Sequence, residues 1–170
     1  MSAEPVILHS GIRDVRFGKG VKVVEPVNLY ECALGNDCFV GPFVEIQCGV
    51  KVGARTRIQS HSFLCEGVTV GEDCFVGHGV MFINDRFKNG GPAQGDRSKW
   101  EKTLIGNRVS IGSNATILPV SICDQVVIGA GAVIKNHVSV DIGASIGTDS
   151  VLHPQVTVGE HCVVGARCIV

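Results

Sequence analysis

Side chains that could do chemistry are concentrated in residues 83–104, which read INDRFKNGGPAQGDRSKWEKTL. This segment carries cations and carboxylates together with Asn84, and it holds the only tryptophan of the chain, Trp100. Its Gly90-Gly91-Pro92 run breaks any regular element. A long polar insertion among regular elements is typically functional, and the alternative is a surface loop that only helps subunits to pack.

Two other chemistries, thiol catalysis and a metal centre, are not expected. The chain has eight cysteines but no Cys-x-x-Cys pair. A zinc site needs three or four ligands at short range, and no cluster of His and Cys supplies them. The glycine-rich hexad at 129–134 opens no helix, so it is not a dinucleotide-binding motif. The polar segment contains no histidine that could act as a general base.

The elements that must position the segment follow a period of six. Large apolar residues recur at every sixth position from Leu34 to Phe82 and again from Ile105 to Val170, with one residue skipped before Ile122. The next residue is glycine in more than half of these hexads, and glycine tolerates tight bends. A small or β-branched residue usually follows four positions after the large one. This period excludes an α-helix and suits short strands bent at corners, with about 18 residues in a coil.

Residues 18 apart should stack in neighbouring coils. Glu66 should therefore lie one coil below Asn84, and we expect Gln59, His61 and His78 to complete a polar neighbourhood around the loop base, with the two histidines roughly stacked. Five cysteines fall on the small inward position and are expected in the core: Cys32, Cys38, Cys74, Cys162 and Cys168. Three are expected to face outward, of which Cys65 could line the site: Cys48, Cys65 and Cys123.

Composition narrows the function classes. The chain has 170 residues, 45% of them hydrophobic, and a net charge of −1. This gives no electrostatic reason to expect binding to nucleic acid or to an anionic membrane. No run is long enough to span a bilayer, and the N-terminus lacks the features of a signal peptide. We therefore expect a cytoplasmic protein with reduced cysteines.

The repeated [LIV]-G-x-x-x-x pattern resembles the hexapeptide repeat of left-handed β-helix proteins. The resemblance implies an all-β fold, a left-handed parallel β-helix of triangular hexapeptide coils with one long inserted loop. We expect a single domain over residues 1–170. Its parts would be an irregular first coil or cap (1–20), coils (21–82), an active-site loop (83–104) and further coils (105–170).

Within that fold, the stretch FINDRF at 82–87 resembles the F-T-N-D-R-Y motif of nucleotide-sugar 3-N-acetyltransferases. The flanking hexads fit the same family from about residue 30 to 136. The resemblance implies transfer of acetyl from acetyl-CoA to the 3-amino group of a dTDP- or UDP-linked sugar by direct attack of the amine, with no metal. It also implies a homotrimer with active sites between subunits and a place in the synthesis of bacterial surface polysaccharides.

Matching by motif gives each site residue an expected role. The resemblance makes Asn84 and Asp85 the catalytic pair that orients the amine. It assigns contact with the sugar, the pyrophosphate or the base to these residues: Gln59, His61, Cys65, Glu66, His78, Phe82, Arg86, Lys88 and Trp100. It assigns coenzyme A contacts to these: Gly112, Ser113, Ala130, Gly131 and Lys135.

Two other functions stay open from the residues alone. One is an O-acetyltransferase that uses His61 or His78 as a general base, because a hydroxyl needs one. The other is a non-catalytic β-helix scaffold. The chain also departs from the 3-N-acetyltransferases in two ways: the hexads continue through residues 140–170, and Cys65 stands where a tyrosine is frequent.

Overall fold

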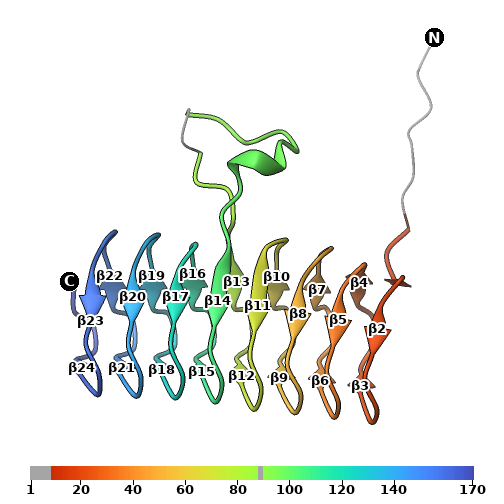
Figure 1. Ribbon diagram of the computed structural model, residues 1–170, viewed down its shortest axis with the longest axis horizontal. Coiled ribbons are helices and arrows are strands. Elements are labelled where there is room, and N and C mark those ends of the chain that lie inside the picture. Colours follow the sequence, from red (N-terminus) through yellow and green to blue (C-terminus); the bar gives the residue numbers. More distant parts are fainter. Residues whose placement is uncertain (1–8, 88–89) are drawn as a thin grey trace.

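The chain forms a parallel β-solenoid. The structure is a computed structural model, and it describes residues 9–87 and 90–170. In this described part, three parallel sheets of eight short strands make the three faces of the solenoid. The coils succeed one another along the long axis, and the loop projects from one corner in the middle of the row (Figure 1). The all-β fold of hexapeptide coils is confirmed, and the arrangement agrees with a left-handed helix.

The strands follow one another in the order sheet A, sheet B, sheet C. Sheet A contains β1 (Ile12–Arg13), β4 (Asn28–Tyr30), β7 (Glu45–Ile46), β10 (Phe63–Leu64), β13 (Met81–Phe82), β16 (Thr116–Ile117), β19 (Val133–Ile134) and β22 (Val151–Leu152). Sheet B contains β2 (Arg16–Phe17), β5 (Ala33–Leu34), β8 (Lys51–Val52), β11 (Val68–Val70), β14 (Thr103–Ile105), β17 (Ser121–Ile122), β20 (Ser139–Val140) and β23 (Thr157–Val158). Sheet C contains β3 (Lys22–Val23), β6 (Phe39–Val40), β9 (Arg57–Ile58), β12 (Phe75–Val76), β15 (Ser110–Ile111), β18 (Val127–Ile128), β21 (Ser145–Ile146) and β24 (Val163–Val164). We call the turn that leads from a sheet A strand to sheet B corner AB, and name corners BC and CA in the same way.

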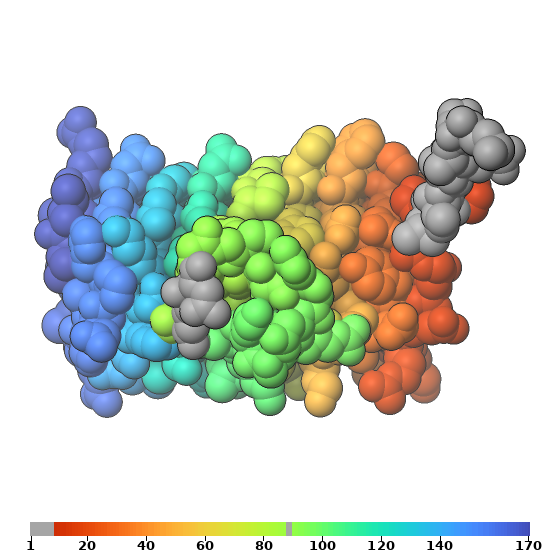
Figure 2. Space-filling model, turned by 90° about the horizontal axis from the view of Figure 1, so that it is seen from above, coloured from red at the N-terminus to blue at the C-terminus, as the bar shows by residue number. Residues whose placement is uncertain are grey.

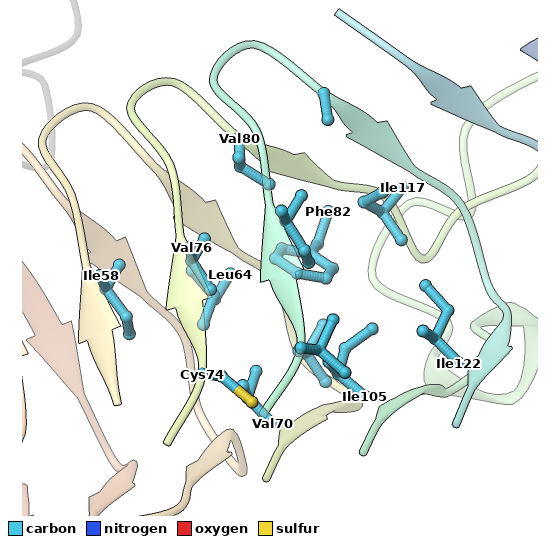
Figure 3. Packing of buried hydrophobic residues seen from close by; sticks show 14 of the residues in the cluster. Ile58, Leu64, Val70, Cys74, Val76, Val80, Phe82, Ile105, Ile117 and Ile122 are labelled. Carbon is cyan, nitrogen blue, oxygen red and sulfur yellow. The ribbon is translucent and has the colours of Figure 1, made fainter. Parts of the chain in front are cut away.

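The interior is a column of large apolar side chains from all three sheets. Phe82, Ile58, Leu64 and Ile117 are fully buried, and Figure 3 shows them pointing into the same interior. Burying each such side chain contributes about 1.5–3 kcal/mol, because apolar surface leaves water.

The sixfold period therefore predicted the core correctly from Leu34 to Val158. In the last coil the prediction is wrong, because no further coil of the described residues covers it: Val170 is 45% exposed, and Cys162, expected in the core, is exposed.

Small polar residues at the inward position join successive coils. Thr56 Oγ1 donates to the carbonyl oxygen of Gly71 at 2.8 Å, and Ser62 Oγ donates to that of Gly77 at 2.8 Å. Thr56 and Ser62 are 0% and 1% exposed. Each hydroxyl thus satisfies a backbone carbonyl at a corner of the next coil, where no strand partner reaches it.

The register shows where the period is shortened. Leu104 pairs with Ser121, 17 residues on, which confirms the residue skipped before Ile122. A second shortening was not predicted: Ala33 pairs with Arg16, also 17 residues apart. The strands consequently begin at Ile12, earlier than the expected start of the coils at residue 21, and β1 and β2 already pair with β4 and β5.

The long insertion leaves corner AB between β13 and β14. Because β14 begins at Thr103, the loop covers residues 83–102, two fewer than expected. Its described residues include a short 3-10 helix, η1 (Arg97–Lys99). Seen from above, the loop lies over the middle coils (Figure 2).

Candidate active site

The base of the loop is tied to the coil that precedes it. Asn84 donates from Nδ2 to the carbonyl oxygen of Glu66 at 2.9 Å. On the returning side, the backbone N–H of Glu101 donates to the carbonyl oxygen of Asn84 at 3.2 Å. The expectation that Glu66 lies one coil below Asn84 is confirmed. Asn84 therefore holds both ends of the loop together.

Asp85 folds the loop itself. Its Oδ1 accepts the backbone N–H of Phe87 at 2.9 Å and its Oδ2 accepts that of Ala93 at 2.6 Å. These two hydrogen bonds, first that from Ala93, hold the pKa of the Asp85 carboxyl below its usual range, and the charge of Lys99 adds to the effect. Asp85 is thus ionised at neutral pH and anchors two points of the loop backbone.

On one side, the loop packs back toward the earlier coils. Arg97 of η1 lies with its Nε 3.3 Å from Glu66 Oε2. Cys48 Sγ donates to the same oxygen at 3.4 Å. Burial and the nearby Glu66 carboxylate raise the pKa of Cys48, so this thiol stays protonated. The exposed Arg97 side chain thus completes a small polar contact with Glu66 and Cys48 at corner AB.

On the other side, the loop meets a later coil through the Glu101 cluster, which we define as Arg86, Glu101 and His137. Glu101 Oε2 lies 3.0 Å from Arg86 Nη1 and 2.8 Å from His137 Nε2. His137 comes from corner AB between β19 and β20, two coils beyond the start of the loop. The carboxylate bridges two nitrogen groups that approach each other to 2.5 Å.

The tautomer of His137 decides which neighbour its Nε2 bonds, because a guanidinium has only donors and a carboxylate only acceptors. With the proton on Nε2, His137 donates to Glu101 and its Nδ1 keeps a lone pair that can accept a proton. With the proton on Nδ1, Nε2 accepts from Arg86 Nη1. The side chain of His137 is 49% exposed, whereas those of Arg86 and Glu101 are 19% and 25% exposed. The imidazole is therefore the member of the cluster that a ligand can reach most easily.

A cavity of about 300 Å³ lies beside this cluster. Its walls come from the returning leg of the loop and from corner AB of the next two coils: Glu101, Lys102, Pro119, Val120, Ser121, His137, Val138 and Ser139. Loop and coils thus border one polar hollow that is open to solvent.

The structure divides the predicted site residues between two corners. Those at corner AB or in its loop are Cys65, Glu66, Asn84, Asp85, Arg86, Trp100 and Lys135. Those at corner CA are Gln59, His61, His78, Gly112, Ser113, Ala130 and Gly131. Lys88 lies outside the described residues. The expectation that Gln59 and the two histidines surround the loop base is wrong, because strands of sheet A separate the two corners.

Three further expectations are corrected. Cys65 and Phe82 are 2% and 0% exposed and belong to the core, so neither lines a site. Burial raises the pKa of the Cys65 thiol to about 12. His61 and His78 do not stack on each other: His61 stacks on the Phe43 ring at 4.8 Å, and His78 Nδ1 lies 2.8 Å from Ser60 Oγ.

Two residues of the site were missed. Neither Glu101, one of several charged residues in the loop, nor His137 is among the residues that the sequence predicted for the site. The period does place His137 at the corner that emits the loop, since it follows Ile134 in the hexad frame. Its contact with Glu101 depends on how the loop folds, and no period predicts that.

Metal and membrane features are not found in the residues that the structure describes. Within 9–87 and 90–170, no group of three or more His, Cys, Asp or Glu side chains could hold a metal ion. Over the same ranges, no helix has the length and apolar character needed to cross a membrane.

Comparisons with known proteins find hexapeptide-repeat transferases. A family model described as the hexapeptide repeat of succinyl-transferase matches residues 102–136 and 155–170, and one described as bacterial transferase hexapeptide (six repeats) matches residues 31–66. The bifunctional protein GlmU of Clostridium acetobutylicum is 32% identical over 147 residues, which are 76% of this chain and 30% of that protein. A UDP-3-O-acylglucosamine N-acyltransferase of Polynucleobacter asymbioticus is 28% identical over 142 residues, which are 69% of this chain and 39% of that protein. The chain thus spans about a third of the length of the relatives it matches.

Solved structures give a weaker likeness. The UDP-N-acetylglucosamine O-acyltransferase LpxA of Moraxella catarrhalis superposes with a TM-score of 0.45 at 13% identity, over 85% of this chain and 65% of that one. A hexapeptide-repeat acetyltransferase of Vibrio cholerae, complexed with acetyl coenzyme A, gives 0.45 at 18% identity, over 86% and 66%. These values are too low to bear on activity.

Proposed function

We propose that the chain is an acyltransferase that moves the acetyl group of acetyl-CoA to the 3-amino group of a nucleotide-linked amino sugar. The observation that carries this proposal is the loop 83–102, which is tied to the coils on both sides and borders an open polar cavity with them. A plain scaffold has no need of such a loop. The N-acyltransferase named among the relatives supports transfer to an amine of a UDP-linked sugar.

In this reaction the neutral amine nitrogen attacks the thioester carbonyl carbon, the carbon–sulfur bond breaks, and coenzyme A leaves as a thiolate that takes up the proton of the amine. A neutral amine is already a nucleophile, so positioning matters more than a strong base. Asp85 can serve this role because a carboxylate has about four acceptor sites and the loop amides occupy only some of them. Asn84 can accept from the amine through Oδ1.

The division of the expected residues between two corners favours a site shared by copies of the chain. Asn84 lies at corner AB, while Ser113, expected to contact coenzyme A, lies at corner CA. In a cyclic trimer, the loop of one copy can face corner CA of the next, because each copy presents both surfaces. Mixed trimers of Asn84→Ala and Ser113→Trp chains should then regain activity that neither parent has, while a site within one chain would give no such recovery.

The direct test measures acetyl-CoA-dependent release of thiol with a panel of dTDP- and UDP-linked 3-amino sugars, and with the matching 3-hydroxy sugars as controls. Release with one amino sugar but not with its hydroxy analogue supports the proposal. Release with neither set refutes it. Thr116→Ala, an outward change on β16 at a residue that makes none of the loop contacts described above, controls for general damage.

A second candidate is an O-acetyltransferase, and one observation favours it. His137 Nε2 lies 2.8 Å from Glu101 Oε2, a pairing that can orient an imidazole as general base. This histidine, rather than His61 or His78, is the one that lies beside the loop. Release with hydroxy sugars, together with a loss of roughly 10²-fold or more in His137→Ala, supports O-transfer. Near-normal rates in His137→Ala favour attack by an amine.

A further inference from the structure

The cavity beside the Glu101 cluster has uncommitted hydrogen-bond donors on two of its walls. Ser121 and Ser139 are register partners on β17 and β20, so their Cα atoms lie about 4.8 Å apart on the outer face of sheet B. Lys102 lines the same cavity from the returning leg of the loop, two residues before Leu104, which is the register partner of Ser121. Within the described residues, neither these hydroxyls nor the Lys102 ammonium has a side-chain partner.

The charge of the cavity favours an anion. Glu101 is the one acidic residue among the lining residues, and its carboxylate is already shared between Arg86 and His137. Lys102 adds a cation that this carboxylate does not neutralise. When Arg86, which pairs with Glu101 beside the cavity, is included, the two cations Arg86 and Lys102 stand against one carboxylate, and the hollow is electropositive.

The contacts of Arg86 with Glu101 and His137 argue against its expected role in holding the pyrophosphate. A guanidinium suits a phosphate because it can donate two parallel hydrogen bonds. Arg86 instead directs Nη1 at Glu101 and His137, and its side chain is only 19% exposed. A phosphate at this corner would have to be held by other donors.

We propose that this cavity is a diphosphate subsite in which Lys102, Ser121 and Ser139 donate to phosphate oxygens. This inference rests on the proposed function only for the source of the diphosphate. Two phosphate groups need several donors, and the cavity offers a flexible ammonium on the loop together with two hydroxyls on neighbouring coils. Both a nucleotide sugar and coenzyme A carry this group, and the chemistry of recognition is the same for either.

The test measures binding of inorganic pyrophosphate to the full chain by isothermal titration calorimetry. We expect saturable binding that weakens about tenfold or more in Lys102→Gln and in the double variant Ser121→Ala/Ser139→Ala, because each loses hydrogen bonds to a charged group. Matched controls are Lys51→Gln, outward on β8, and Ser145→Ala, outward on β21; they should bind as the unchanged chain does.

Competition with pyrophosphate then identifies which substrate supplies the diphosphate. UDP or dTDP displacing pyrophosphate assigns the subsite to the acceptor, and coenzyme A displacing it assigns it to the donor. The proposal is overturned if pyrophosphate does not bind, or if the cavity variants bind it as tightly as the controls do while their circular dichroism is unchanged. Acetyl transfer without pyrophosphate binding would refute the subsite alone, and binding without transfer would refute the proposed function alone.

Discussion

Replacing Thr56 by valine tests the inward hydroxyls that join the coils. Thr56 is 0% exposed, and its Oγ1 both donates to the Gly71 carbonyl at 2.8 Å and accepts the Cys74 N–H at 3.0 Å. Valine keeps the shape but removes the donor and the acceptor. Each backbone group left unsatisfied inside a protein costs about 1–3 kcal/mol. Gly71 is partly exposed, so we expect the free energy of unfolding to fall by about 2–4 kcal/mol.

Urea unfolding followed by far-ultraviolet circular dichroism measures this loss as a lower midpoint with an unchanged slope. The matched control is Thr116→Val, because Thr116 points outward on β16; we expect a change within about 0.5 kcal/mol. Ser62→Ala should repeat the effect, since Ser62 makes the same contact with Gly77. If Thr56→Val and Thr116→Val have equal midpoints, the inward hydroxyl contributes nothing and the reasoning is refuted.

Three further changes probe the corner, the core and the loop. Gly53→Ala should lower the unfolding midpoint, because a Cβ there would lie 2.5 Å from the backbone of the next coil, whereas Gly91→Ala meets nothing within 4 Å and should not; equal midpoints would contradict this. Cys65, buried and with its pKa raised to about 12, should resist a thiol reagent that labels the exposed Cys123, as mass spectrometry of the native chain can check. Asp85 has a lowered pKa in the folded chain, so it stabilises the loop above its unfolded pKa, and this stabilisation disappears as the pH falls through the folded value. As the pH is lowered, the fluorescence of Trp100 in the loop should change when Asp85 is protonated, and Asp85→Asn should abolish this change. If the change persists in the variant, protonation of another group causes it.

The repeating part of the fold could be predicted from the sequence because each coil of a solenoid contacts only its neighbours. Coil length and inward positions follow from a period that each coil shares with its neighbours, and even the skipped residue before Ile122 could be read from it. The first coil was missed because the corner from Leu29 to Leu34 is one residue short. Counting back by six from Leu34 lands on Asn28, which is polar and hides the repeat.

The candidate site was predicted less well, for two physical reasons. Alternation between inward and outward side chains holds along extended backbone, but Cys65 lies in a turn, where that rule no longer applies. The contact between Glu101 and His137 is made by a loop without a period. The hexad pattern does not predict that the loop folds toward the later coil. Stacking by 18 did succeed for Glu66 and Asn84, because both lie on the regular frame.

The insertion between β13 and β14 leaves the register of the coils undisturbed. Val68 pairs with Thr103 across 35 residues, yet the flanking strands stack as they do elsewhere. Doubling a loop costs only about 0.6 kcal/mol of closure entropy. The length and composition of this loop can therefore change through evolution almost independently of the solenoid. If the proposed function holds, a new acceptor specificity can arise by exchange of this one surface segment, while the coils that carry it keep both their sequence pattern and their stability.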